Sequence, residues 1–407
     1  MTYNSILINN EIHVAGVNAY VPLGMEDLNG NKFKFLMNDS NVKSIIHGYH
    51  HGIIWKNNGD VLVFGLNNFG QLGFASIGSD HINKPTVLLN DLQIKSICCG
   101  SNHTMILKNN GEIFVFGDNR YCQLGLKHNN YICTPTLLIK DPEIKSIYCG
   151  GDHSMILKNN GELFVFGCNV FGQLGFGNFE NINVPTLLMK DPDIELIKCG
   201  CYHSMILKNN GDLFVFGNNM CGQLGLGIGD YKNINVPTFL TKIPEIKSIQ
   251  CGLRHTMILK NNGELLVCGD NRSGQLGLEV EQNDTVCKLT KLMKDTNVKS
   301  ICCRGDYSMI LKNNGELYAF GDNTYGQLGL EKDELNIHTP TLILTNSTIN
   351  LQEQQIQIMW KHHNHIHYST KFKQRIDTFM FFLKRNYMST GLKIPKFVVF
   401  EIIKFTI

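Results

Sequence analysis

The sequence has 407 residues, of which 43% are hydrophobic and 18% charged, and this composition is typical of a globular protein. The 37 basic and 35 acidic residues leave a net charge of +2, which gives no electrostatic reason to expect a nucleic acid or a membrane surface as partner. No apolar stretch is long enough to span a bilayer, and the first residues lack the pattern of a signal peptide. We therefore expect a protein of the cytoplasm or nucleus, not a secreted one, whose 14 cysteines are reduced.

The chain opens with a predicted hairpin. Residues 6–16 (ILINNEIHVAG) match a stretch that returns later as ILKNNGELFVFG, with the turn glycine deleted. The sequence therefore begins midway through a repeated unit.

Six whole units follow, at about residues 42–345. Each unit carries two markers that keep the same spacing of 50 or 52 residues. Asn-Asn-Gly starts at Asn57, Asn109, Asn159, Asn209, Asn261 and Asn313. Gln-Leu-Gly starts at Gln71, Gln123, Gln173, Gln223, Gln275 and Gln327. A period near 50 residues indicates a β-propeller or an array of β-units.

The third unit shows the predicted elements of each repeat. Residues 144–150 and 155–158 form two strands, and 162–167 form a third that is rich in aromatic and β-branched residues. The Asn-Gly between the second and third strands predicts a type I′ turn. A short outer strand, 185–188, completes four antiparallel strands, which is the content of one propeller blade.

The C-terminal residues are predicted to complete the ring and then to leave it. Residues 338–344 are the outer strand of the sixth unit, and 356–369 align with the innermost strand of the second unit. We therefore predict a seventh blade shared by residues 1–41 and 355–369, which leaves no exposed sheet edge. Residues 370–407 have the apolar spacing of a helical extension, so the predicted domains are 1–369 and 370–407.

The string CGGDHSMILKNNGELFVFGCNVFGQLGFG (149–177) resembles the regulator of chromosome condensation repeat. The resemblance implies an all-β fold, a seven-bladed β-propeller whose last blade joins both termini. The family includes an exchange factor for the Ran GTPase, ubiquitin ligases and pure interaction proteins, so the fold does not settle the function.

Several residues recur once per unit, which favours a structural role over a catalytic one. We predict that the histidine of each Gly-x-x-His element hydrogen-bonds a neighbouring backbone group, although a ring of histidines near the axis is also compatible with metal or anion binding. The sixth unit departs, with Arg304 and Tyr307 in these places. The structural residues are His51, His103, His153, His203, His255, Gly111, Gly161, Gly211, Gly263 and Gly315. The recurring cysteines before the glycines are predicted to pack as small buried hydrophobes, and Asp118, Asp270 and Asp322 to hold loops by bonding backbone amides.

The residue before each histidine differs from unit to unit. The resemblance implies that exchange factors use an aspartate at the place of Asp152, on the face that binds the GTPase. No connection here matches the wedge-like insertion of those factors. The candidate partner-binding residues are Asp152, Asp306, Arg254 and Tyr202. Surface loops on a rigid scaffold often supply specificity, and the loops that vary most are 26–31, 75–84, 126–134, 176–184, 226–236, 279–288 and 331–339.

Two features of the C-terminal segment carry sharper hypotheses. Residues 393–405 weakly resemble the opening helix of an F-box-like segment, which recruits a ubiquitin-ligase scaffold. The candidate adaptor-binding residues are Ile394, Pro395, Val399, Ile402 and Ile403. His363, His365 and His367 alternate along a predicted strand, but the cluster lacks thiolate or acidic companions, so we predict no metal and no cofactor.

The sequence therefore favours a monomeric, non-enzymatic scaffold for protein–protein interaction, with a partner that the sequence does not name. Two alternatives remain open. One is a guanine nucleotide exchange factor for a small GTPase. The other is an adaptor that recruits substrates to a ubiquitin ligase through the C-terminal segment.

Overall fold

The computed structural model describes residues 4–8, 11–15, 34–74, 81–227, 232–279, 285–330 and 335–345. By its contacts the chain divides into two compact units, Met1–Ile343 and Leu344–Ile407, and nearly all the described residues belong to the first. Every element of this described part is a β-strand. None of it forms a helix with the length and apolar character needed to cross a membrane.

Six four-stranded antiparallel sheets correspond to the six repeats, and we call them blades 1 to 6 in chain order. Blades 1 to 3 contain β4 (Val42–His47), β5 (His51–Lys56), β6 (Asp60–Leu66), β7 (His81–Asn90), β8 (Ile94–Cys99), β9 (His103–Lys108), β10 (Glu112–Gly117), β11 (Ile132–Lys140), β12 (Ile144–Cys149), β13 (His153–Lys158), β14 (Glu162–Gly167) and β15 (Ile182–Lys190). Blades 4 to 6 contain β16 (Ile194–Cys199), β17 (His203–Lys208), β18 (Asp212–Gly217), β19 (Ile234–Lys242), β20 (Ile246–Cys251), β21 (His255–Lys260), β22 (Glu264–Asp270), β23 (Thr285–Lys294), β24 (Val298–Arg304), β25 (Tyr307–Lys312), β26 (Leu317–Asp322) and β27 (Asn336–Leu344).

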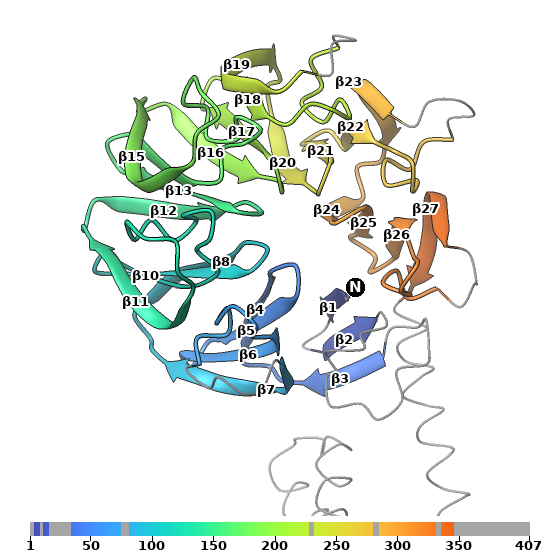
Figure 1. Cartoon of the computed structure of the whole chain (residues 1–407). Helices are drawn as coiled ribbons and strands as arrows, with labels where there is room; N and C mark the ends of the chain where they lie inside the picture. The colour runs from blue at the N-terminus through green and yellow to red at the C-terminus, as the bar shows by residue number, and fades with distance from the viewer. Residues whose placement is uncertain are drawn as a thin grey trace, which may run out of the picture. The chain divides into compact units, whose positions relative to one another are not determined.

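The blades stand around a common axis, as Figure 1 shows. The first strand of each blade is the innermost, since the ends of β4, β8, β12, β16, β20 and β24 line a central hollow. The hydrophobic core lies between blades. Val115 of blade 2, for example, belongs to the same buried cluster as Ile147 and Phe166 of blade 3. Burial of large apolar side chains between blades is therefore the main stabilising contribution to the ring.

The hairpin between the second and third strands is confirmed, but the predicted type I′ turn is wrong. In blade 3 the pairing of Leu157 with Leu163 leaves a three-residue loop beyond Lys158, and the amide of Gly161 donates to the carbonyl of Lys158 at 3.1 Å. Only Gly161 has a positive φ, 83°, whereas type I′ requires it at both central positions. A Cβ on Gly161 would also lie 2.3 Å from the carbonyl oxygen of Asp191, so the turn and the next connection both require glycine.

The N-terminal residues form a three-stranded sheet of β1 (Asn4–Ile8), β2 (Glu11–Ala15) and β3 (Lys34–Asn38), in which β1 contacts β4. The described part of the chain therefore has six four-stranded blades, not the seven that the sequence predicted. The strand that was predicted to complete a seventh blade, in 355–369, lies outside the described residues. The predicted helical extension, 370–407, also lies outside them and is not supported.

The order of the strands gives the ring two faces. The loops between the first and second strands and between the third and fourth strands lie at one end of each blade, which we call the loop face. The Asn-Asn-Gly turns and the connections between blades lie at the opposite end, the turn face. The Gly-x-x-His and Gln-Leu-Gly elements both belong to the loop face, where they can act together.

Candidate functional site

The centre of the loop face is a cavity of about 180 Å³ lined by the loops between the first and second strands of all six blades. Backbone hydrogen bonds join these loops in succession around the axis. The amide of Ser101 donates to the carbonyl of Gly151 at 2.8 Å, and the amide of Leu253 donates to that of Gly305 at the same distance. The rim of the cavity is therefore a rigid frame on which side chains are displayed.

Behind this frame, each histidine joins its own blade to the next. His153 Nε2 lies 3.0 Å from the hydroxyl of Ser204 in blade 4, and that hydroxyl donates to the carbonyl of Gln173, back in blade 3, at 2.9 Å. The other four contacts, between 2.8 and 3.0 Å, are His51–Thr104, His103–Ser154, His203–Thr256 and His255–Ser308. We call these five pairs the His–hydroxyl contacts. The histidines therefore contact a side chain and not the backbone group that the sequence predicted. The sequence feature that indicates this partner is the Ser or Thr that directly follows His or Tyr in five units.

The hydrogen bonds fix the charge state of these histidines. Because the serine proton is used on the Gln173 carbonyl, His153 must donate through Nε2–H, which leaves Nδ1 as an acceptor. This nitrogen is buried and finds no hydrogen-bond partner among the described residues. Burial, with the nearby His103 and His203, lowers the pKa of His153 to about 3. A buried, neutral imidazole that donates its one N–H to a neighbouring blade is a structural element.

Where the N-terminal sheet β1–β3 stands between blades 6 and 1 (Figure 1), neither of these two blades supplies this contact. Tyr307 occupies the histidine position of blade 6, and Gly52 occupies the hydroxyl position of blade 1. Arg304, which replaces the loop glycine, donates from its guanidinium to the carbonyl of Gly48 in blade 1. The sixth-unit departures seen in the sequence therefore occur together at one place in the ring.

The Gln-Leu-Gly loops are held by their own amide side chains. In blade 3 the amide of Phe171 donates to Gln173 Oε1 at 2.9 Å, and the amide of Leu174 donates to Asn169 Oδ1 at 2.9 Å. The acidic residues at the start of some of these loops also accept backbone amides: Arg120 donates to Asp118 at 3.0 Å, and Thr324 to Asp322 at 2.9 Å. These carboxylates are thus engaged in loop structure.

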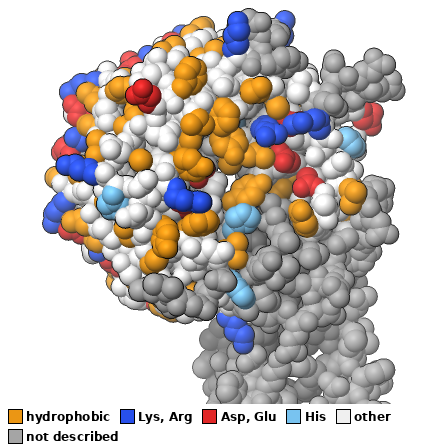
Figure 2. Space-filling view, viewed as in Figure 1, with side chains coloured by type: hydrophobic (Ala, Val, Ile, Leu, Met, Phe, Trp, Pro, Cys, Tyr) orange, Lys and Arg blue, Asp and Glu red, His pale blue; other side chains and the backbone are white. Residues whose placement is uncertain are grey.

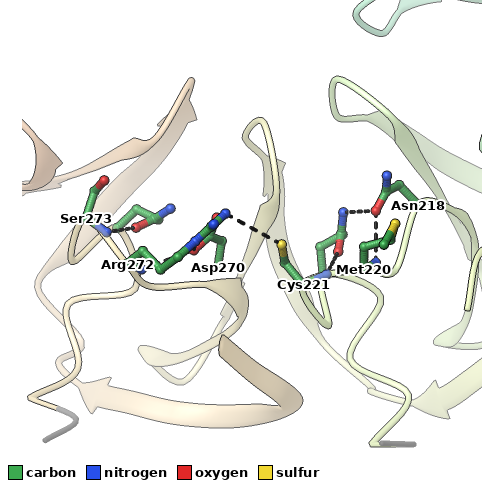
Figure 3. Close-up of polar contacts among 8 residues, drawn as sticks. Asn218, Met220, Cys221, Asp270, Arg272 and Ser273 are labelled. Atoms are coloured by element: carbon green, nitrogen blue, oxygen red, sulfur yellow. Dashed lines mark hydrogen bonds and ion pairs between the residues drawn. The ribbon is translucent and has the colours of Figure 1, made fainter. Parts of the chain in front are cut away.

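Two of these loops carry a matching Asp–Arg ion pair. In blade 5, Arg272 donates from Nε to Asp270 at 2.9 Å and extends Nη2 to within 3.9 Å of Cys221 Sγ in blade 4 (Figure 3). In blade 2, Arg120 pairs with Asp118 at 2.7 Å and lies over the Phe69 ring of blade 1. Each arginine is about half exposed, so each presents cationic surface on the loop face close to a boundary between blades.

Asp152 and Asp306 lie beside these ion pairs, each on the following blade. Asp152 accepts a hydrogen bond of 3.4 Å from Gln123 Nε2, and its pKa is raised to about 6 by burial and by Asp118, against the opposing effect of Arg120. Burial also raises the pKa of Asp306 to about 6, helped by Asp270 and opposed by Arg254. Two equivalent acid–base clusters therefore occupy the loop face. The sequence analysis had named Asp152 and Asp306 as binding candidates, but Asp118 and Asp270 only as loop residues.

The structure places the four candidate residues at the same position of their loops, each half-buried around the cavity. Tyr202 packs edge-on against Phe171 of the preceding blade, with ring centroids 5.1 Å apart. Met220 is exposed nearby, at 57% of its surface. The face drawn in Figure 2 has hydrophobic side chains gathered over the centre of the ring, with charged groups beside them. His50 and Asn102 hold the same loop position in blades 1 and 2 and were not among the candidates.

Within the described ranges, no three side chains among His, Cys, Asp and Glu converge as a metal site would require. The axial cysteines are thiols, because burial raises the pKa of Cys201 and Cys251 to about 12. The histidine cluster at 362–367 and the adaptor-binding candidates between 394 and 403 lie outside the described residues.

The sequence matches the model of the RCC1-like domain over residues 4–247, which is more than half of the chain. The chain belongs to the RCC1 repeat family. Further RCC1 (regulator of chromosome condensation) repeats match at residues 246–275, 298–327 and 314–353. The family identified from the sequence is thereby confirmed.

Relatives of the chain within the RCC1 family carry different names. The chain is 34% identical to the Protein RCC2 homolog of Xenopus laevis over 107 residues, 26% of this chain and 21% of that protein. It is 33% identical to the X-linked retinitis pigmentosa GTPase regulator of Homo sapiens over 306 residues, 72% of this chain and 29% of the relative. The chain thus spans less than a third of the length of these curated relatives.

Among solved structures, Prp20p from Saccharomyces cerevisiae is similar with a TM-score of 0.74 and 22% identity, covering 84% of this chain and 88% of that one. Human WBSCR16 is similar with a TM-score of 0.67 and 23% identity, covering 77% of this chain and 84% of that one. At this level of identity the similarity shows the shared propeller fold.

Proposed function

We propose that this protein is a non-enzymatic scaffold that binds another protein through the loop face of its propeller. One observation carries the proposal. The residue immediately before the repeated histidine or tyrosine differs in nearly every blade, whereas the framework behind it is repeated. These residues are His50, Asn102, Asp152, Tyr202, Arg254 and Asp306. A rigid frame with varied side chains is the arrangement that a specific binding surface requires.

The chemistry of the loop face supports the same proposal. Protein interfaces are enriched in Tyr, Met and Arg, and Tyr202, Met220 and Arg272 all present surface here. Asp152 and Asp306 are half-buried carboxylates with raised pKa values, and ionisable groups perturbed by their surroundings cluster at functional sites. The proposed partner is a protein, bound by a monomer of this chain in the cytoplasm or nucleus without a cofactor and without direct contact to nucleic acid or membrane.

An affinity purification tests this proposal. The full chain and a variant carrying Asp152→Ala and Tyr202→Ala are used in parallel as baits, with quantitative mass spectrometry of the captured proteins. The expected result is at least one partner depleted tenfold or more by the double substitution. A partner list that is unchanged by these substitutions, and by exchange of two of the variable loops, would overturn the proposal.

A second candidate function is nucleotide exchange on a small GTPase. Two observations favour it: Asp152 stands at the loop position that the family resemblance marks for exchange, and one relative, from Mus musculus, is named a secretion-regulating guanine nucleotide exchange factor, at 32% identity over 85 residues. Release of a fluorescent guanine nucleotide from a panel of small GTPases decides between the two. Acceleration that disappears in Asp152→Ala would establish exchange, and no acceleration on any GTPase would remove this candidate.

The ubiquitin-ligase adaptor remains a prediction from the sequence, because Ile394, Pro395, Val399, Ile402 and Ile403 lie outside the described residues. Coprecipitation of the full chain, and of residues 1–369, with an adaptor of the Skp type tests it. Binding that is lost on truncation would support the adaptor, and absence of binding by the full chain would exclude it.

A further inference from the structure

The innermost strands of neighbouring blades meet through a regular pair of positions near the loop face. The two residues of each innermost strand before the loop glycine, or before Arg304 in blade 6, form a first and a second position, and in blades 2 and 3 the first position of one blade contacts the second position of the next. In blades 1 to 6 the first position holds Ile46, Cys98, Tyr148, Lys198, Gln250 and Cys302, and the second holds His47, Cys99, Cys149, Cys199, Cys251 and Cys303.

Blades 2 and 3 place sulfur on both sides of this pair. Cys98 Sγ of β8 lies 2.6 Å from Cys149 Sγ of β12, and the two strands contact each other along the axis. Both residues are free thiols and both are half-buried, and Cys149 lines the central cavity. The two positions are 51 residues apart in the chain, so nothing but the propeller fold brings them together.

The other boundaries keep the same geometry without a second sulfur. The pKa of Tyr148 is raised by burial, with a smaller contribution from Cys199 of the next blade. The pKa of Cys251 is raised by burial and is affected in the opposite sense by Lys198 of the preceding blade. Tyr148 and Lys198 thus each lie near a cysteine of the next blade. In blades 1 to 5 only blade 2 holds a cysteine in the first position, and its sulfur is in contact with that of Cys149.

We propose that Cys98 and Cys149 form a redox-sensitive disulfide that cross-links blades 2 and 3. The oxidant is a peroxide. Because burial raises the pKa of the Cys149 thiol, Cys98 is assigned the first step. Cys98, reacting as its thiolate, attacks a peroxide oxygen, which breaks the O–O bond and gives a sulfenic acid and a first water. The second thiol then attacks the sulfenic sulfur, forms the S–S bond and releases a second water. Two thiols and one hydrogen peroxide thus give one disulfide and two waters, and a small dithiol reverses the change by exchange.

The cross-link has a structural consequence for the loop face. Cys149 leads directly into Gly150, Gly151 and Asp152, so the disulfide ties the loop that carries Asp152 to blade 2. An effect on partner binding rests on the proposed function, whereas formation of the disulfide does not. Chemical mapping of the cysteines therefore tests the cross-link alone, whether or not the loop face binds a partner.

The test uses the purified full chain, treated with hydrogen peroxide, alkylated and digested without reduction for mass spectrometry. The expected product is a peptide pair joined through Cys98 and Cys149, lighter by two hydrogen atoms than the two thiol peptides. The thermal midpoint should rise by a few degrees on oxidation and return after treatment with dithiothreitol, because a cross-link restricts the unfolded chain.

Cys98→Ser and Cys149→Ser should each abolish both the cross-linked peptide and the rise in midpoint. Cys199→Ser, in the equivalent position of blade 4, is the matched control and should leave both unchanged. A peptide pair dominated by Cys99 or Cys199, oxidation that stops at sulfinic acids, or a rise in midpoint that persists in Cys98→Ser would overturn the proposal. Cys98→Ala, which adds no polar atom, provides the same test if the serine variant does not fold.

Discussion

His153 Nε2 and Ser204 Oγ lie 3.0 Å apart across the boundary between blades 3 and 4. The hydroxyl donates a hydrogen bond to the carbonyl of Gln173, so one serine bonds two groups of the neighbouring blade. The same arrangement recurs at five boundaries of the ring. This contact explains why a histidine repeats in a protein for which we propose no enzymatic activity: it orders the loop face by fixing each blade to the next.

Removal of either partner of this contact should destabilise the ring. We expect His153→Ala to lower the free energy of unfolding by about 2–4 kcal/mol, because a buried ring and its hydrogen bond are both lost. Ser204→Ala should cost about 1–2 kcal/mol, since the Gln173 carbonyl loses its donor. In a double-mutant cycle measured by urea denaturation, the double variant should lose about 1 kcal/mol less than the sum of the two single losses. Fully additive costs would show that the two side chains do not interact.

The buried histidines should make the fold sensitive to acid. Burial lowers the pKa of His255 to about 4, so below the ordinary value near 6.5 the unfolded chain binds a proton that the folded chain does not. Stability is therefore present at neutral pH and lost as the pH falls from about 6.5 to 4, by about 1.4 kcal/mol per pH unit for each such histidine. His255→Tyr introduces the residue that blade 6 has at this position. It should reduce the slope of unfolding free energy against pH by about 1.4 kcal/mol per pH unit, the contribution of one histidine. An unchanged slope would mean that His255 is protonated in the folded protein.

Gly150 should not tolerate a side chain, although its backbone is not in the left-handed region. A Cβ at this position would lie 2.0 Å from Cε1 of His153, so the ring would have to move away from Ser204. We expect Gly150→Ala to lower the thermal midpoint, at a cost of about 1–3 kcal/mol. Gly177→Ala is the control. A Cβ on Gly177 would lie 3.9 Å from the nearest atom, a side-chain carbon of Val236, so the substitution should cost only the strain of a residue with a φ of 81°. A smaller loss in Gly150→Ala than in this control would refute the packing argument.

Asp152 should reduce stability at neutral pH. Its pKa is raised to about 6 by burial and by Asp118, so the folded protein binds the proton more tightly than the unfolded chain, and stability falls as the pH rises through 6. Asp152→Asn should therefore raise the free energy of unfolding by about 1 kcal/mol at pH 7.5, after allowance for partial exposure, and leave it unchanged at pH 4.

Asp141 provides a control of opposite sign for that measurement. Its pKa is lowered by the backbone amide of Glu143 and by Lys158, so its charge stabilises the fold above about pH 4. Asp141→Asn should lower stability at pH 7.5. Equal effects of the two substitutions would contradict the assigned environment of Asp152.

The sequence was sufficient to predict the propeller, because local patterns determine it. Asn159-Asn160-Gly161 and Gln173-Leu174-Gly175 recur with the period of a blade, and alternating residues such as those of 144–150 define the strands. The turn type was missed because the positive φ falls on Gly161 alone, and a dipeptide pattern does not distinguish a two-residue loop from a three-residue loop.

Contacts between blades were harder to predict from the sequence. The pairs His153–Ser204 and Asp118–Asp152 depend on which strands face each other in the ring, and no spacing within one unit encodes that relationship. The prediction of a seventh four-stranded blade was wrong for the described residues. It depended on a poor match at 356–369, where the sequence hardly follows the repeat.

The proposal that the loop face binds a protein partner is tested most directly by comparing substitutions on the two faces of the propeller. Asp152→Ala with Tyr202→Ala alters the loop face, and Glu143→Ala with Lys145→Ala alters exposed residues at the opposite end of β12. Affinity of each variant for a partner captured by the full chain is measured with purified proteins. We predict a loss of at least tenfold for the loop-face variant and no change for the turn-face variant. Equal affinity of both variants, or loss only in the turn-face variant, would contradict the assignment of partner binding to the loop face.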